Sequence, residues 1–420
     1  MTQRVVCFGP GPKFKGGISN YNTSLAKAFD KLGCETHIVS WTQQYPAIIP
    51  REFVDKSSKT DLLEGTNIQV KYLTNYNKPA TWKQPAKYIA SLNPDKVIIQ
   101  WSIAIQGLPI GSMVKSLKKL GVKEVILDLH FVVQKENSTL DQKLTKQGIK
   151  HADNYVVHAL KTANELKTLF PNKQFHITES GERKKGIQNV IKLYHPVYDL
   201  FKPDPNFDKE AFKAKHGLKK HVFLFFGFIR KYKGLHQAIE AFAALAEKRD
   251  DVSLIICGES FWNTLDNAKW STKIKQTLFG TAKKIFLKKE DDEQNYNPLA
   301  LVDELKLTDK TLVVNEFVAN EDVPQYFQVS DAVLLFYLYA TPSGVESLSY
   351  NFDMPILATN VGHFPETITD GFNGYLAKDR DVADMTRVME EFLAHPIDRK
   401  NVAKTTEKMS WENYAKAILK

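Results

Sequence analysis

Two short segments combine glycine and lysine in a pattern that could hold phosphate. In each segment an apolar stretch ends in Phe-Gly, five residues follow, and Lys-Gly stands before an amphipathic segment of helix length. The first copy runs from Phe8 to Gly16 and the second from Phe226 to Gly234. Glycine lets backbone approach a ligand closely, a helix N-terminus offers unpaired N–H groups, and lysine adds a cation. The two copies predict two similar α/β domains that face one anionic ligand.

The alternation of strand-like and helix-like segments supports this interpretation, although a single loop of this kind also forms for local steric reasons. Short β-branched and aromatic runs alternate with amphipathic segments, which is typical of parallel sheets with crossover helices. We expect strands over 4–9, 36–41, 68–73, 96–101, 124–130 and 154–159, and then over 221–228, 252–258, 310–318, 332–337 and 355–360. Between 257 and 310 we expect a long surface insertion.

The chain of 420 residues is longer than one core usually fills, so two domains are expected. The proline-rich segment 195–208 is typical of a linker and divides the chain into domains over 1–200 and 201–408. Residues from about 409 to 420 form an amphipathic helix, with Trp411, Tyr414 and Ile418 on one face.

The composition indicates a cytoplasmic protein. With 43% hydrophobic and 25% charged residues the chain is typical of globular domains, and no apolar run reaches the roughly 18 residues that span a bilayer. The first residues show no signal-peptide pattern. Cys7, Cys34 and Cys257 share no ligand-like spacing, so we expect buried free thiols in a reducing compartment.

Positive charge is concentrated in the first half of the chain. Residues 1–200 contain 28 Lys and Arg against 16 Asp and Glu, whereas residues 201–420 contain 29 against 32. Much of the excess lies on segments predicted as helices: Lys115, Lys118, Lys119 and Lys123, then Lys143, Lys146 and Lys150, then Arg183, Lys184 and Lys185. These residues are either a solvated surface or a means of attraction to an acidic acceptor or the anionic inner membrane face. Nucleic acid is disfavoured, because no recognised binding module is present.

Seven motifs resemble, in the same order, those of GT-B glycosyltransferases, and in particular of GT4-type retaining enzymes that use nucleotide-sugar donors. The motifs are GGISNYNTSLAKAF (16–29), LDLH (127–130), HPVYDLF (195–201), FFGFIRKYKGLHQAIEAFA (225–243), ICGES (256–260), EDVPQYFQVSDAVLLFY (321–337) and PSGVESLSYNFDMPILATNVGHFPE (342–366). The resemblance implies two Rossmann-like domains with parallel sheets that face a central cleft. It also implies a donor-binding C-terminal domain, an acceptor-binding N-terminal domain, and a final helix that crosses back to the N-terminal domain.

Two cations are the candidate catalytic groups for the leaving diphosphate. The departing nucleoside diphosphate gains negative charge, so cations directed at it stabilise the transition state more than the ground state. Arg230 and Lys233 fit this role, and two solvated loop cations are the alternative. The family pattern has its arginine five residues before the lysine, where this chain has Phe228, so Arg230 stands two positions late.

The resemblance implies further site residues. His130 follows a strand at its C-terminal end and matches the family histidine that contacts the transferred sugar, so we include it among the catalytic candidates, with a structural histidine as the alternative. Gly16 and Gly17 match the family's glycine pair that approaches the donor, with a structural turn as the alternative. Gly227, in the second Phe-Gly motif, is expected to let the backbone approach the donor. Glu259 is expected near the nucleotide, with a helix cap as the alternative. The base-binding loop is expected around 316–318.

The segment TPSGVESLSYNF departs from the family pattern. GT4 enzymes carry two glutamates eight positions apart, and those positions are Ala340 and Leu348 here, which cannot accept hydrogen bonds through their side chains. We expect a helix start at Ser343 that binds the diphosphate through backbone N–H groups, together with the Ser343 hydroxyl.

The same segment contributes the last donor-binding candidates, Gly344, Val345 and Glu346. Gly344 and Val345 are expected to supply the N–H groups. Ser343 and Glu346 have capping-box spacing, so Glu346 is either a donor ligand or a helix cap.

These motifs predict an enzyme that moves a sugar from a nucleotide diphosphate sugar to a saccharide or lipid-linked acceptor, in cell-surface polysaccharide or glycolipid synthesis. We expect retention of configuration, no cofactor besides the donor substrate, and no metal, because no Asp-x-Asp pair follows a strand. The missing glutamate pair leaves two alternatives open, namely a non-catalytic nucleotide-sugar-binding protein and a nucleotide-sugar epimerase of the same fold.

Overall fold

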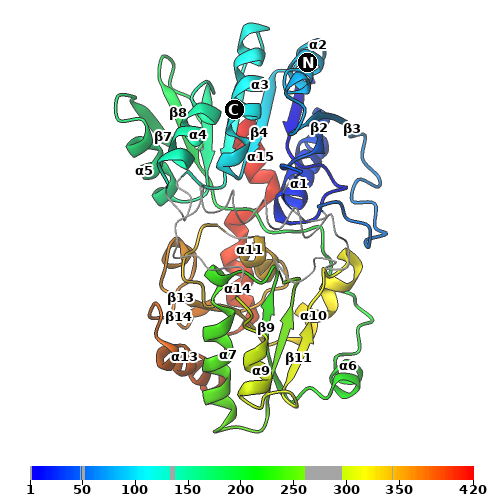
Figure 1. Ribbon diagram of the computed structural model, residues 1–420, viewed down its shortest axis with the longest axis vertical. Coiled ribbons are helices and arrows are strands. Elements are labelled where there is room, and N and C mark those ends of the chain that lie inside the picture. The colour runs from blue at the N-terminus through cyan, green and yellow to red at the C-terminus, as the bar shows by residue number, and fades with distance from the viewer. Residues whose placement is uncertain (1, 48, 50–52, 133–137, 261–295, 343) are drawn as a thin grey trace.

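The computed structural model contains two α/β domains, one above the other along the long axis of the molecule (Figure 1). It describes residues 2–47, 49, 53–132, 138–260, 296–342 and 344–420. Most of the predicted insertion between 257 and 310 lies outside these residues. Both ends of the chain lie in the upper, N-terminal domain.

The N-terminal domain is an eight-stranded parallel sheet with helices packed against it. Strand order in space is β3-β2-β1-β4-β5-β6-β8-β7. The strands are β1 (Arg4–Phe8), β2 (Glu35–Gln43), β3 (Gln69–Asn75), β4 (Lys96–Trp101), β5 (Val125–Leu129), β6 (Asn154–Val157), β7 (Phe175–Thr178) and β8 (Gln188–Lys192). The helices are α1 (Gly17–Lys31), α2 (Gln84–Ser91), α3 (Gly107–Lys119), α4 (Thr139–Ile149) and α5 (Leu160–Leu169).

The C-terminal domain is a six-stranded parallel sheet in the order β11-β10-β9-β12-β13-β14. Its strands are β9 (His221–Phe226), β10 (Val252–Cys257), β11 (Thr311–Val314), β12 (Ala332–Leu335), β13 (Ile356–Thr359) and β14 (Gly374–Ala377). Its helices are α6 (Lys209–His216), α7 (Leu235–Ala246), α9 (Ala300–Glu304), α10 (Val323–Val329), α11 (Gly344–Asn351), α12 (Phe364–Thr367), α13 (Val382–Ala394) and α14 (Arg399–Thr406). The central strands of both sheets are buried on both faces, as expected for parallel strands covered by helices.

Strand order reverses at the same place in both sheets. The chain moves outward from β1 to β3 and then returns to the other side of β1 with β4, and β9 to β12 repeat this order. Ligands of open α/β sheets bind at such a switch point, outside the carboxyl ends of the strands. The two Phe-Gly motifs follow β1 and β9, so the topology puts both of them at switch points. The predicted fold of two Rossmann-like domains is confirmed.

The strand predictions were less complete at the sheet edges. All eleven expected strands are present, but β7, β8 and β14 were missed. Each of these has only four or five residues, and β14 begins with Gly374, so the strand signal is weak. The expectation that Arg183, Lys184 and Lys185 lie on a helix was wrong. Arg183 lies in the loop before β8, where its guanidinium contacts Glu124 at 3.0 Å and donates to the Ile418 carbonyl at 2.8 Å.

The final helix α15 (Trp411–Leu419) crosses back to the N-terminal domain, as predicted, and packs against α1 (Figure 1). Trp411 is 5% exposed, and its ring centre lies 4.9 Å from that of Tyr21 on α1. The Tyr414 hydroxyl donates to Asp128 at the end of β5, at 3.1 Å. Trp411 is therefore a hydrophobic anchor for a segment that starts in the other domain.

The cysteines and the helix lengths were also subjects of prediction. Cys7, Cys34 and Cys257 are buried free thiols, as predicted. Among the described helices, none combines the length and the apolar character needed to cross a membrane.

Candidate active site between the two domains

A cavity of about 280 Å³ lies between the two domains, at the switch points of both sheets. Seven of the predicted site residues line it: Gly16 and Gly17 from the N-terminal domain, and Gly227, Lys233, Glu259, Gly344 and Val345 from the C-terminal domain. His130, Arg230 and Glu346 are not among the described residues of its wall. Ser343 lies outside the residues that the structure describes.

The two glycine-lysine loops meet at this cavity. A Cβ on Gly16 would lie 3.7 Å from the ring of Phe228, which directly follows Gly227. Gly16 and Gly227 have φ angles of 102° and 93°, which side chains other than hydrogen rarely allow. Lys15 reaches across to the C-terminal domain, where Nζ lies 4.8 Å from the ring centre of Phe317. The loops from the two domains thus form opposite walls of one site.

Lys233 is the buried cation of the cavity. It closes the 3-10 turn Lys231–Lys233 before α7 and is only 7% exposed. Burial and the nearby charge of Arg230 lower the pKa of Lys233 to about 7. An anion at this place would stabilise the protonated amine, because an opposite charge nearby favours the charged form.

Arg230 is close enough to Lys233 to affect its pKa but is not among the described residues that line the cavity. It is the residue before the 3-10 turn, and its guanidinium carbon lies 5.9 Å from the ring centre of Tyr232. Its charge reaches the site through its effect on the pKa of Lys233. The proposed contact of Arg230 with a diphosphate stays a prediction.

Helix α11 begins at the cavity. Its first residues, Gly344 and Val345, line the wall, and the first N–H groups of a helix have no partner within the helix. Leu348, which stands where GT4 enzymes carry the second glutamate, also lines the wall. The loop that was expected to hold the base, 316–318, forms another part of the wall.

Glu346 is 4% exposed and, within the part of the chain that the structure describes, is not among the residues that line the cavity. One carboxylate oxygen lies 2.5 Å from Nε2 of His363, and the other accepts a hydrogen bond of 2.5 Å from the hydroxyl of Thr367. These contacts join α11 to the loop after β13. The sequence pattern did not predict this pairing, because His363 and Thr367 lie 17 and 21 residues further along the chain.

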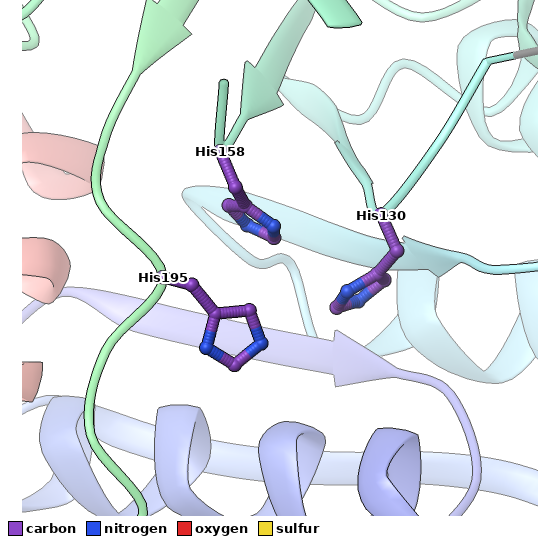
Figure 2. Close-up of side chains that lie close together, drawn as sticks. All are labelled: His130, His158 and His195. Atoms are coloured by element: carbon purple, nitrogen blue, oxygen red, sulfur yellow. The ribbon is translucent and has the colours of Figure 1, made fainter. Parts of the chain in front are cut away.

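His130 is buried beside α1. Its Nε2 lies 2.8 Å from Oε1 of Gln100, and its ring packs edge-on against Tyr21 at 4.7 Å between centres. Burial lowers the pKa of His130 to about 3, so the ring is neutral at pH 7. His130, His158 and His195 come from separate segments and their rings cluster together, as Figure 2 shows. The catalytic role of His130 stays a prediction.

These three histidines could in principle hold a metal, because one ring nitrogen from each lies within 4.8 Å of the others. Each ring already has a protein partner. Nε2 of His158 lies 3.0 Å from Asp128 and 3.0 Å from Tyr414, and Nδ1 of His195 lies 2.5 Å from the Ser347 hydroxyl. His158 thus connects β5 with α15, and His195 joins the segment between the domains to α11.

Sequence reasoning missed several residues of the cavity wall. They are Phe14, Asn20, Asp55, Tyr198, Phe201, Tyr232, Asn320, Val323, Tyr337, Thr341 and Pro342, among others. The sequence could have indicated Tyr198, because a large aromatic side chain within a proline-rich linker is expected to be buried against one of the domains.

The C-terminal domain matches a known family model. Residues 206–409 match the model of the family described as "Glycosyl transferases group 1". The match covers the C-terminal domain and slightly less than half of the chain. The group 1 match and the fold together confirm the resemblance to GT-B glycosyltransferases and support a glycosyltransferase enzyme, as predicted.

Two curated proteins are similar to parts of this chain. Spore coat protein SA of Bacillus subtilis is 25% identical over 192 residues, which are 45% of this chain and 43% of that protein. An uncharacterized 41.2 kDa protein in the cps region of Klebsiella pneumoniae is 26% identical over 98 residues, which are 23% and 27% of the two chains. The matched segments span less than half of the length of these relatives.

Solved structures of similar fold cover nearly the whole chain. HepE of Anabaena, in a complex with UDP-glucose, has a TM-score of 0.67 at 14% identity and covers 99% of this chain and 98% of its own. A glycosyltransferase of Rickettsia africae has a TM-score of 0.65 at 15% identity, with 100% and 97% covered. Both domains of this chain therefore share the GT-B architecture of these proteins.

Proposed function

We propose that this chain transfers a sugar from a nucleotide diphosphate sugar to a saccharide or lipid-linked acceptor. The observation that carries the proposal is the cavity between the domains, where glycine loops from both sheets and the buried Lys233 converge. A neutral or half-charged lysine in a water-poor site becomes fully charged when an anion arrives. A diphosphate supplies that anion, and its charge increases as the glycosidic bond breaks.

In the proposed mechanism Lys233 and the first N–H groups of α11 stabilise the leaving diphosphate. These groups are fixed before the reaction, so they require no reorganisation as charge develops. They supply positive charge where other transferases use a cation, which supports transfer without a metal and with the donor as the only small molecule besides the acceptor. Retention of the anomeric configuration is proposed by analogy with the GT4-type enzymes that the motifs resemble.

Uridine diphosphate sugars are the first donors to test. HepE of Anabaena, a structural neighbour of the whole chain, is described in complexes with UDP and with UDP-glucose. For the acceptor, the relatives are described as a spore coat protein and a protein in a cps region, and a further neighbour of this fold as a lipopolysaccharide outer core galactosyltransferase. These descriptions support a role in cell-surface polysaccharide or glycolipid synthesis.

The test is a thermal-shift screen of UDP-, GDP-, ADP- and dTDP-sugars, followed by product analysis with the donor that binds. A ligand that binds only the native state raises the melting temperature. Release of the nucleoside diphosphate with formation of a glycoside supports transfer, and the anomeric proton of the product reports retention. Binding without turnover over a range of acceptors would support the non-catalytic alternative, and conversion of the donor alone would support an epimerase.

Lys233→Ala is the variant that connects the chemistry to the cavity. Its turnover should fall about 100-fold, which is the size expected for the loss of one contact to the transition-state charge. Lys231→Ala, two residues away and outside the cavity lining among the described residues, is the matched control. Equal turnover in both variants and the wild type would remove Lys233 from the site.

We also propose that the N-terminal domain meets an anionic membrane surface on the cytoplasmic side. Leu108 and Leu120, each 50% exposed, lie at the two ends of α3, and Lys115 and Lys119 on α3 are exposed. Exposed leucines and lysines together suit a lipid headgroup layer. Co-sedimentation with anionic vesicles should weaken as salt is added, whereas neutral vesicles should not bind. Binding that is independent of salt, or no binding, would contradict the proposal.

A further inference from the structure

The segment that connects the two domains does more than join them. It runs from the end of β8 to the start of α6, and Tyr198 in this segment is 3% exposed. The Tyr198 hydroxyl donates a hydrogen bond of 2.7 Å to the carbonyl of Gly17, the first residue of α1. The backbone N–H of Tyr198 donates to the Ser347 carbonyl on α11, at 3.4 Å. One residue thus contacts the first turns of two helices from different domains.

The phenol ring of Tyr198 fills the gap between these two helices. A Cβ on Gly344, the first residue of α11, would lie 2.9 Å from Cε2 of Tyr198 and 3.0 Å from its hydroxyl oxygen. A Cβ on Gly17 would lie 3.3 Å from the same hydroxyl oxygen. Glycine is needed at position 344 because the ring occupies the space of a side chain. Tyr198, Gly17 and Gly344 all line the cavity.

The surroundings of Tyr198 hold the ring in one place. The ring of His195 packs against it edge-on with 5.6 Å between centres, and Nδ1 of His195 lies 2.5 Å from the Ser347 hydroxyl. Burial raises the pKa of the Tyr198 phenol, so the hydroxyl keeps its proton and continues to donate. The ring is therefore a spacer of fixed length between α1 and α11.

We propose that Tyr198 is a positioning residue that sets the spacing between the N-termini of α1 and α11, and so aligns the N-terminal domain with a donor held by the C-terminal domain. The inference rests on the proposed function, because the spacing affects catalysis only if α1 and α11 form the two sides of one donor site. It predicts that a change at Tyr198 affects turnover more than donor affinity. The nucleotide stays on the C-terminal domain, while the groups from the N-terminal domain are displaced.

Tyr198→Phe tests the hydrogen bond while the ring is kept. The loss of one hydrogen bond to Gly17 should lower kcat about 3- to 10-fold. The KM for the donor should stay close to the wild-type value, because binding of the ground state is retained. Tyr194→Phe in the same segment, outside the described cavity lining, is the matched control and should behave as the wild type. Wild-type kinetics of Tyr198→Phe would overturn the proposal.

A double-mutant cycle tests the spacing itself. Gly344→Ala in the wild-type background should lower kcat/KM about tenfold or more, since the new Cβ meets the ring. In the Tyr198→Ala background the ring is gone, and the same substitution should cost much less. Equal costs in the two backgrounds would overturn the proposal, and thermal melting of each variant separates this coupling from unfolding. A wild-type chain that transfers no sugar from any donor would refute the proposed function and this inference with it, whereas an active chain with an additive cycle would refute the inference alone.

Discussion

Nζ of Lys233 lies 2.8 Å from the position that a Cβ on Gly227 would occupy. Gly227 has a φ of 93°, and the same Cβ would lie 3.2 Å from Cγ2 of Val345 on α11. The amine therefore sits directly against the backbone of the β9 loop, in a space that only glycine leaves open. This contact explains why the second motif combines a glycine at position 227 with a lysine at position 233: the lysine amine occupies the space that a side chain at position 227 would fill.

Gly227→Ala should lower kcat/KM about 10- to 100-fold, because it displaces the Lys233 amine from its proposed position at the diphosphate, and small displacements in an active site have effects of this size. The backbone conformation also makes the variant less stable. Gly217→Ala is the matched control, since Gly217 has a φ of 66° and no heavy atom within 4 Å of a new Cβ. Steady-state kinetics and melting curves of both variants should show similar destabilisation and a loss of activity in Gly227→Ala alone. A similar loss of activity in both would mean that strain, not the contact with Lys233, is responsible.

Donor binding should take up protons above pH 7. Burial and Arg230 lower the pKa of Lys233 to about 7 in the free chain, and a bound diphosphate raises it again. At pH 8 the free amine is mostly neutral and the bound amine is charged, so calorimetry in buffers of different ionisation enthalpy should report uptake of up to about one proton. Donor affinity should fall as pH rises from 7 to 9. Lys233→Met should remove both effects, and proton uptake that persists in this variant would assign it to another group.

The same pKa has a consequence for stability. The unfolded chain keeps the Lys233 amine protonated up to its usual pKa of 10.5, whereas the folded chain loses the proton near pH 7. The unfolded state binds more protons between these values, so the contribution of Lys233 to the free energy of unfolding rises with pH through this window. Urea unfolding of the wild type and of Lys233→Met checks this at pH 7 and pH 9. The free energy of unfolding of the wild type minus that of Lys233→Met should be larger at pH 9 than at pH 7.

The parts of the molecule that local sequence determines could be predicted, and those that depend on contacts between distant segments could not. The glycine-lysine loops were predictable because the strand, the glycine and the helix start are adjacent in sequence. The cavity follows from them, since parallel topology brings the ends of β1 and β9 to switch points. The direction of a side chain depends on its neighbours. Nothing in the sequence indicated that Nε2 of His130 contacts Gln100 on β4 or that its ring packs against Tyr21 on α1.

Glu346 shows the same limit. Its spacing from Ser343 indicates a helix cap, and its place in the motif indicates a donor ligand. In the structure both carboxylate oxygens contact residues after β13. No local pattern contains that information, because the partners come together only when β13 pairs with β12.

Glu346→Gln should lower the free energy of unfolding by about 1–3 kcal/mol, because a buried carboxylate with two partners is replaced by an amide that can accept through only one atom. Turnover should change little at temperatures where the variant is folded. Glu240→Gln on α7 is the control, since Glu240 is exposed. Urea unfolding measures the difference between the two variants. A large fall in turnover with wild-type melting behaviour would instead place Glu346 in the donor site.

Trp411→Ala tests whether the crossing of α15 stabilises the whole chain. Trp411 is almost fully buried against Tyr21, and removal of a buried tryptophan typically costs about 3–5 kcal/mol. Tyr21 also packs against His130 and His195, so the cavity left by the indole should loosen α1, which carries Gly17 at its first turn. We therefore expect a lower midpoint of urea unfolding together with a fall in turnover.

Lys416→Ala on the same helix is the control. It removes an exposed pair with Glu412 and should change the free energy of unfolding by at most about 0.5 kcal/mol. If both variants unfold at the wild-type urea concentration, α15 contributes no anchoring energy, and the two domains are held together by their other contacts, such as the hydrogen bond from Asn320 to Ser58.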